Sequence, residues 1–282
     1  MDIKSLGGVH FDCIYNAFSL AFKDYDVQLN KSQLIKMLKR RGFDPNLSFA
    51  YFDNGEIISF ILNGIGNFNG RPTAYDTGTG TIEEYRGQGL ASKLFEHSIP
   101  FLKKENIKQY LLEVIQHNTN AVSLYKNMGF NITRELFYYI LKKDFFSDNK
   151  CQCEYNLINR IDFSQLKDHI SFWDFQPSWQ NGIESVIRDQ DAFETIVVLD
   201  NGSIIGYCIY EPETGDIAQL AVKKEFRNRG IATSLLKEAV SNILINTVKI
   251  INTESNCKSI NEFLYSAGAK VTGMQYEMLR EL

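Results

Sequence analysis

Two residues of this 282-residue chain could act as a catalytic base and a catalytic acid, judged from their side chains and their sequence neighbours. Glu113 lies in the apolar run of residues 109–115, which is typical of a buried strand. A carboxylate there is expected to have either a basic partner or a chemical role, because burying an unpaired charge is costly. Tyr125 lies on the helical pattern of residues 120–128 and offers a phenol that can donate a proton. The alternative for Tyr125 is an ordinary helix residue whose hydroxyl is satisfied locally.

Two glycine-containing loops could bind a pyrophosphate. Each reads Glu-aromatic-Arg-x-x-Gly-aliphatic-Ala and leads into an apolar pattern with helical spacing. Glycine lets backbone N–H groups approach a ligand closely, and the first turn of a helix offers unpaired donors and a positive dipole end. The arginine of each loop can add charge. The candidate ligand-binding residues are Arg86, Gly87, Gln88, Gly89, Leu90, Ala91 and Ser92 in the first loop, and Arg227, Arg229, Gly230, Ile231 and Ala232 in the second.

The pattern Arg-x-x-Gly-x-Ala resembles the acyl-CoA loop of the GNAT superfamily of N-acetyltransferases. A second stretch, from Val114 to Phe130, resembles the superfamily signature Val-x-x-x-Asn-x-x-Ala-x-x-Leu-Tyr-x-x-x-Gly-Phe at every named position. The resemblance assigns Tyr125 as the acid that protonates the leaving thiolate and adds Asn118 to the CoA-binding residues. The segment around Glu113 looks most like the ribosomal-protein alanine acetyltransferases, where the matching glutamate is the base.

These similarities imply transfer of an acetyl group from acetyl-CoA to a primary amine of a small molecule or peptide. A carboxylate can deprotonate the attacking amine, and a phenol near the sulfur can protonate the thiolate. In the second half Leu264 falls opposite Tyr125 and Asn252 falls opposite Glu113, so the acid and the base are missing there. Two alternatives stay open: a non-catalytic module that binds or senses acyl-CoA, and catalysis in the C-terminal half.

The resemblance also implies the fold, which is α/β (α+β) with two tandem GNAT-like domains. Each domain is expected to contain a mixed, mostly antiparallel sheet flanked by helices. The repeat of the loop half a chain later places the domains at residues 1–146 and 151–282, with a polar seam at 142–150. The first is expected to be catalytic, and whether the second is degenerate stays open. Trp173 and Trp179 are expected to lie either at the junction between the domains or in the wall of a cleft.

Local patterns predict the elements that carry these residues. Turn sequences Asp53-Asn54-Gly55 and Asp200-Asn201-Gly202 each predict a β-hairpin. Helices are expected at 11–22, 31–40, 90–102, 120–128 and 231–244, with the third disturbed at Pro100, and strands at 73–82, 109–115 and 216–222. Thr79 and Thr81 stand where aliphatic residues are usual in the superfamily, and this fits either ordinary strand residues or a polar substrate wall.

The overall composition is that of a globular protein with substantial cores: 44% of residues are hydrophobic and 23% charged. A net charge of −4 without a basic block argues against a nucleic-acid partner. No stretch has the pattern of a signal peptide or membrane span, so we expect a cytoplasmic protein with no membrane partner. Five scattered cysteines argue against a disulfide framework, and Cys151-Gln152-Cys153 has no second ligand pair, so no metal is expected. Composition does not indicate an oligomeric state.

Overall fold

The computed structural model describes all residues except 1, 26–27, 144–154, 156 and 160–161. It contains two compact units. The first consists of Met1–Thr133 together with Glu277–Leu282, and the second of Arg134–Tyr276. Most of the seam expected at 142–150 lies outside the described residues, and the units do not follow the expected boundary at 146–151, because each half of the chain contributes a strand segment to the other unit.

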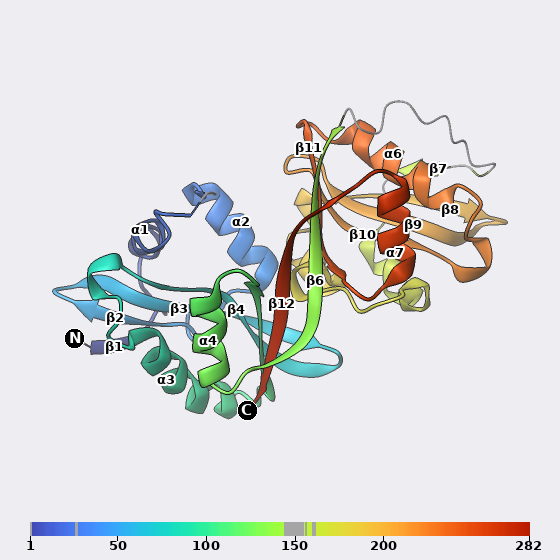
Figure 1. Ribbon diagram of the computed structural model, residues 1–282. Coiled ribbons are helices and arrows are strands. Elements are labelled where there is room, and N and C mark those ends of the chain that lie inside the picture. The colour runs from blue at the N-terminus through green and yellow to red at the C-terminus, as the bar shows by residue number, and fades with distance from the viewer. Residues whose placement is uncertain (1, 26–27, 144–154, 156, 160–161) are drawn as a thin grey trace. The chain divides into compact units, whose positions relative to one another are not determined.

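The first unit is an open sheet with helices on both faces (Figure 1). Its strands follow the order β1-β2-β3-β4-β5, next to which lies the end of β12. Pairing is antiparallel except between β4 and β5, which run parallel. The elements are β1 (Asp2–Ser5), α1 (Phe11–Ala21), α2 (Lys31–Arg41), β2 (Phe49–Asp53), β3 (Glu56–Phe68), β4 (Arg71–Thr81), a short 3₁₀ turn (Glu83–Tyr85), α3 (Leu90–Lys104), β5 (Gln109–Ile115) and α4 (Thr119–Asn127).

Helices α1 and α2 cover one face of this sheet and α3 covers the other (Figure 1). The first face forms a core from residues of α1, α2, β2 and β3, including Ala17, Leu34 and Phe60. On the other face Phe49 of β2 contacts the rings of His97 and Phe101 on α3. The two faces are therefore buried by different helices, which fixes the register of the strands between them.

Local sequence accounts for three features of the first unit, of which the β2–β3 hairpin was expected. Asn54 and Gly55 adopt positive φ angles of 49° and 87° and close the β2–β3 hairpin. Asn30 and Gln33 form a reciprocal capping box at the start of α2. Pro100, where a disturbance was expected, does not end α3, which runs through it to Lys104. Ile99 and Leu102 are buried on either side of the proline and hold both segments in place.

The second unit repeats this plan. Its strands follow the order β6-β11-β10-β9-β8-β7, with the start of β12 beside β6. Asn201 and Gly202, with φ angles of 48° and 78°, close the expected β8–β9 hairpin. The elements are β6 (Asn131–Lys142), β7 (Leu157–Asn159), a 3₁₀ segment (Phe163–Phe172), 3₁₀ turns (Trp179–Asn181, Gln190–Ala192 and Lys224–Phe226), α5 (Ile183–Arg188), β8 (Glu194–Asp200), β9 (Ser203–Glu211), β10 (Asp216–Val222), α6 (Ile231–Asn242), β11 (Thr247–Glu254), α7 (Lys258–Ser266) and β12 (Val271–Glu281).

Strands β6 and β12 each contribute to both units. Residues 136–142 of β6 pair antiparallel with β11, and Tyr139 is fully buried in the core of the second unit. Conversely, residues 277–282 at the end of the chain belong to the first unit. There Met278 is fully buried and Arg280 donates hydrogen bonds to the carbonyl of Met128 (2.6 Å) and to Glu96 (2.8 Å). Each unit thus depends on a segment from the other half of the sequence.

Candidate active site

The first unit contains an opening between two parallel strands. Strands β4 and β5 pair only over residues 73–75 and 109–111 and then diverge. Because both strands run in the same direction, the loops that lead to α3 and α4 begin at the same edge of the sheet. The expected ligand-binding loop precedes α3, whereas Asn118 precedes α4. This arrangement brings two helix N-termini, with their unpaired N–H donors, to the same edge.

The backbone of the first loop is accessible to a ligand. Gly87 and Gly89 adopt φ angles of 76° and 70°, and Gly89 is the N-terminal cap residue of α3. No side chain caps this helix end. A Cβ atom placed on either glycine would meet no atom within 4 Å, so open space lies next to the loop. Leu90 is buried and anchors the first turn, while Ala91 and Ser92 are half-buried beside it.

The arginine of this loop is exposed, yet its guanidinium is hydrogen-bonded to the protein. The Arg86 guanidinium donates to the carbonyls of Thr81 (3.2 Å) and Ala21 (3.0 Å) and lies 3.7 Å from Asp24. It therefore ties the loop to the end of α1. The geometry supports a role in shaping the loop, and direct contact between Arg86 and a pyrophosphate stays a prediction.

Tyr125 is held by a carboxylate that sequence reasoning did not select. Its hydroxyl donates to Asp76 Oδ2 at 2.9 Å, and the Thr79 hydroxyl donates to the same oxygen at 2.9 Å. The backbone N–H of Gly78 donates to Oδ1 at 2.9 Å. The available signal was an acidic residue inside the strand sequence Tyr75-Asp76-Thr77, where both neighbours are buried. The structure also gives Thr79, noted as unusual, a definite partner.

This cluster has unusual proton affinities. Burial raises the pKa of Asp76, although hydrogen bonds from Thr79 and Tyr125 partly oppose the shift. Burial, followed by the negative charge of Asp76, raises the pKa of Tyr125 well above its usual value. Tyr125 is therefore a neutral phenol at ordinary pH, and Asp76 binds a proton more readily than an exposed aspartate. Groups with such shifts are frequent at functional sites.

Glu113 and Asn118 occupy the diverging part of β5 and the start of α4. Glu113 is half-buried, and its charge contributes, after burial, to raising the pKa of Tyr75 on β4. The Asn118 side chain caps α4 by accepting from the N–H of Ala121 at 3.1 Å. A structural role is thus visible for Asn118, while its contact with CoA and the role of Glu113 as a base stay predictions.

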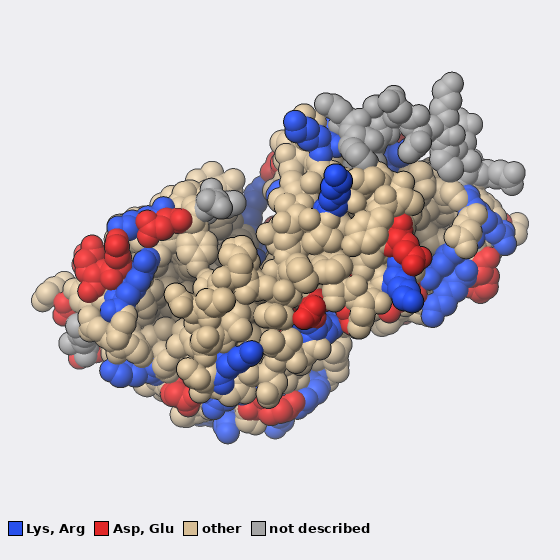
Figure 2. Space-filling view, viewed as in Figure 1, with Lys and Arg blue, Asp and Glu red and all other residues tan. Residues whose placement is uncertain are grey.

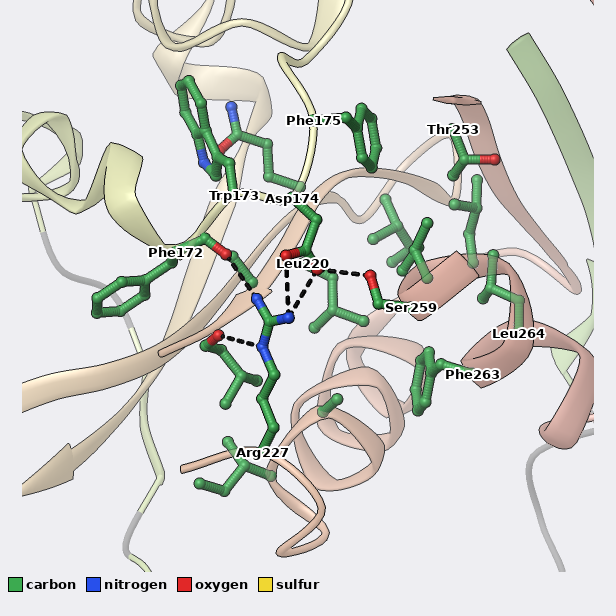
Figure 3. Close-up of a pocket in the computed structure, with 18 of the residues that line it drawn as sticks. Phe172, Trp173, Asp174, Phe175, Leu220, Arg227, Thr253, Ser259, Phe263 and Leu264 are labelled. Carbon is green, nitrogen blue, oxygen red and sulfur yellow. Dashed lines mark hydrogen bonds and ion pairs between the residues drawn. The ribbon is translucent and has the colours of Figure 1, made fainter. Parts of the chain in front are cut away.

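The second loop has the same backbone form and the same arginine geometry. Gly230 adopts a φ of 78° and caps α6. Arg227 donates to the carbonyls of Val222 and Phe172, each at 3.0 Å, and to both oxygens of Asp174 at 2.8 and 3.0 Å (Figure 3). Asp174 also accepts a hydrogen bond from Ser259 at the start of α7. The arginine therefore ties each loop to the segment that precedes its hairpin.

The other predicted residues of this loop differ in exposure. Arg229 folds back, with its guanidinium 5.0 Å from the Phe226 ring and a hydrogen bond of 3.1 Å to the Tyr155 hydroxyl. Ile231 is buried in the core, whereas Ala232 is half-buried. Gly230, Ile231 and Ala232 all line a pocket.

This pocket, of about 660 Å³, lies where the parallel strands β10 and β11 diverge after Ile217 and Ile250. Its walls are largely apolar and come from both strands, from α6 and α7, and from residues 172–177 (Figure 3). Trp173 forms part of the wall and donates from Nε1 to the Tyr207 hydroxyl, in agreement with the cleft alternative. Trp179 is instead buried, with the Arg188 guanidinium 5.3 Å from its ring.

The residues matched to Tyr125 and Glu113, Leu264 and Asn252, both line this pocket. Leu264 is buried and lines the pocket. Asn252 is buried, donates to Ser178 Oγ at 3.1 Å and accepts from Gln275 at 3.2 Å. The pocket thus has an apolar group and an amide where the first unit has a phenol and a carboxylate.

Charge and metal-ligand patterns add little to the site. On the face shown in Figure 2, basic and acidic side chains are interspersed among the described residues. Within the described part of the chain, no group of three or more His, Cys, Asp or Glu side chains is placed to hold a metal ion. Cys151 and Cys153 lie outside it. No described helix is both long enough and apolar enough to cross a membrane.

Comparison with known proteins identifies the family. The model of the acetyltransferase (GNAT) family matches residues 13–130 and again residues 158–262, which together make up more than half of the chain. The chain belongs to the GNAT acetyltransferase family. Both matches include a glycine loop and the helix that follows it. This GNAT protein accordingly contains two copies of the family fold.

Similar sequences are named as N-acetyltransferases. The chain is 31% identical over 98 residues to N-alpha-acetyltransferase 30 of Schizosaccharomyces pombe, covering 34% of this chain and 65% of that protein. It is 31% identical over 85 residues to the ribosomal protein bS18 alanine N-acetyltransferase of Escherichia coli K12, covering 30% and 55%. The match therefore spans between half and two thirds of each relative.

Similar structures share the tandem architecture. A tandem GNAT protein from the clavulanic acid biosynthesis pathway superposes with a TM-score of 0.74 at 14% identity, over 99% of this chain and 98% of that one. An acetyltransferase from Sphaerobacter thermophilus superposes with a TM-score of 0.67 at 15% identity, over 99% and 95%. At these identities the similarity concerns the fold, and it confirms the expected pair of mixed α/β domains.

Proposed function

We propose that the first unit transfers an acetyl group from acetyl-CoA to a primary amine of a small molecule or peptide. The observation that supports this most directly is the contact of 2.9 Å between Tyr125 and Asp76, at the same sheet edge as the open Gly89 loop. The loop would bind the pyrophosphate through backbone N–H groups, and the thioester would lie between the diverging strands. A module that only binds CoA has no need for a part-buried phenol–carboxylate pair.

In this proposal Glu113 removes a proton from the acceptor and Tyr125 protonates the departing sulfur. The amine must be neutral to attack the thioester carbon, and the thiolate that leaves must be protonated. The names of the two relatives favour an α-amine of a protein or peptide as the acceptor. A small-molecule amine remains the alternative.

The pocket of the second unit supports a second candidate, a non-catalytic acyl-CoA site. Its Gly230 loop has the same form as the first loop, and its apolar walls include Leu264 in place of a phenol. Such a site would bind ligand without accelerating transfer. Catalysis in this unit is the third possibility and would require groups other than those at the matched positions.

Steady-state acetyl transfer, followed by thiol release with a panel of amines and short peptides, tests these proposals. Tyr125→Phe and Glu113→Gln should each lower kcat by about 10²–10⁴, the usual effect of removing a positioned acid or base. The matched variants Leu264→Ala and Asn252→Ala should leave the chemical step nearly unchanged. If the first pair turns over like the parent while Gly230→Trp is inactive, the active site lies in the second unit.

A further inference from the structure

Asp76 is fixed in place by an irregularity of strand β4. The pairing of β3 with β4 shifts by one residue, so that Asn63 pairs with Asp76 but Leu62 pairs with Gly78. The residue between them, Thr77, donates its hydroxyl to the Leu62 carbonyl at 2.9 Å. Such bulges redirect side chains and are common beside active sites. Here the bulge lets both oxygens of Asp76 accept hydrogen bonds, Oδ1 from the Gly78 N–H and Oδ2 from Thr79 and Tyr125.

This contact determines where the phenolic hydrogen of Tyr125 lies. A phenol has one hydrogen, and an ionised carboxylate can only accept. While Asp76 is ionised, the hydrogen of Tyr125 therefore lies in the 2.9 Å bond to Oδ2 and is unavailable to a leaving sulfur. Once Asp76 is protonated, the carboxyl can become the donor and the phenol hydrogen is free to point elsewhere. The protonation state of Asp76 thus controls whether Tyr125 can act as an acid.

The groups around Asp76 are consistent with reversible protonation. Arg41 at the end of α2 donates to the carbonyl of Thr77 at 3.1 Å, and its positive charge favours the ionised carboxylate. Burial favours the neutral form more strongly and raises the pKa of Asp76. Tyr110 on β5 and Tyr75 on β4 also experience the charge of Asp76, and Glu113 lies beyond them beside Tyr75.

We propose that Asp76 is the proton reservoir of Tyr125, storing a proton that comes from the acceptor nitrogen and replacing the one that Tyr125 gives to the thiolate. The inference rests on the proposed acetyl transfer in the first unit. No described contact of the second unit reproduces this pair: Leu264 stands opposite Tyr125, and Ile217 stands opposite Asp76 at the same sequence offset that separates Arg86 from Arg227.

The proton balance closes over one turnover. Asp76 begins protonated. The ammonium gives a proton to Glu113, which passes it to solvent, and the neutral amine attacks the thioester carbon. The C–S bond then breaks, the sulfur takes the proton of Tyr125, and the phenolate takes the proton held on Asp76. The extra N–H proton of the intermediate then passes to Asp76, directly or through water. Asp76 and Tyr125 return to their starting states, and one proton is released overall.

The first test is a double-mutant cycle on kcat. Asp76→Asn keeps an acceptor oxygen and the side-chain volume but cannot store a proton, so we expect kcat to fall about 10²-fold or more with little change in KM for acetyl-CoA. Because Asp76 acts through Tyr125, Asp76→Asn/Tyr125→Phe should be no slower than the slower single variant. Thr79→Val, which removes only the neighbouring donor, should cost less than tenfold. The proposal would be overturned if the two substitutions lowered kcat by independent factors that multiply in the double variant, or if Asp76→Asn turned over like the parent.

The second test does not depend on turnover. With tyrosine labelled at Cζ, the carbon NMR signal of Tyr125, assigned by its loss in Tyr125→Phe, reports ionisation of the phenol. In Asp76→Asn the titration of Tyr125 should move to lower pH, because the negative charge next to it is gone. If the titration of Tyr125 is the same in Asp76→Asn and in the parent, the coupling between Asp76 and Tyr125 is refuted, even if no acceptor is found. If this titration shifts but the parent transfers no acetyl group, only the acetyl-transfer proposal is refuted. Should Asp76→Asn not fold, Asp76→Ser provides the same comparison.

Discussion

Gly89→Ala separates the ligand-binding role of the first loop from its effect on stability. Gly89 has a φ of 70°, and a Cβ there would meet nothing within 4 Å, so the cost to folding comes from backbone conformation alone. A left-handed conformation costs an L-residue about 1–2 kcal/mol. For a unit of this size, each kcal/mol lowers the melting temperature by about 4 °C. The Cβ would nevertheless project into the space where a pyrophosphate is expected.

Gly55→Ala is the matched control. Gly55 lies in the β2–β3 hairpin of the same unit, has a φ of 87° and likewise has no atom within 4 Å of a built Cβ. Both variants should therefore lose similar stability. Only Gly89→Ala should lose ligand affinity, because displacing one hydrogen bond to a charged phosphate costs about 1.5–3 kcal/mol, or about 10- to 150-fold in Kd.

Titration calorimetry with CoA measures this difference. Gly230→Ala tests the loop of the second unit in the same way, and the stoichiometry of the parent shows whether one site or two bind. If Gly89→Ala binds CoA with the affinity and stoichiometry of Gly55→Ala, the backbone of the first loop does not hold the pyrophosphate, and the proposed binding site is wrong.

Three further predictions concern stability. Folding raises the pKa of Asp76 above 3.8, so the parent loses stability as pH rises through the folded pKa. The melting temperature of Asp76→Asn relative to that of the parent should therefore increase from pH 4 to pH 7. A decrease would contradict the raised pKa. Burial alone would raise the pKa of Asp174, but the hydrogen bond from Ser259 and the charge of Arg227 outweigh burial and lower this pKa. Asp174→Asn should therefore reduce the free energy of unfolding by about 1 kcal/mol or less near pH 7, and this loss should shrink as pH falls below 3.8. Urea unfolding at several pH values measures the change. Met278→Ala should lower the free energy of unfolding by about 2–5 kcal/mol and increase hydrogen exchange in the first unit, whose other residues are far away in sequence. The control Met274→Ala, at a half-buried position of the same strand, should lower it less. Equal protection of the first unit in both variants would refute its dependence on β12.

Local sequence was sufficient for the elements and for the general position of the site. The Asn-Gly turns at 54–55 and 201–202 and the glycines that start α3 and α6 adopt positive φ angles, as these residues prefer. Such preferences depend on a few neighbouring residues, so they can be recognised without knowing the fold. The repeated loop likewise indicated two copies of one fold, which the two family matches confirm.

Tertiary structure alone decided which side chains meet. Asp76 and Tyr125 are 49 residues apart in sequence, and their contact depends on a bulge in β4 and on the position of α4, neither of which has a periodic signature. The same holds for Arg86 and Arg227, whose guanidinium groups donate hydrogen bonds to carbonyls 65 and 55 residues away. The contribution of β6 and β12 to both units was also invisible, because strand pairing is set by long-range packing rather than by composition. Sequence therefore determined the local conformations and the candidate groups, whereas long-range packing determined their partners, and with them their proton affinities.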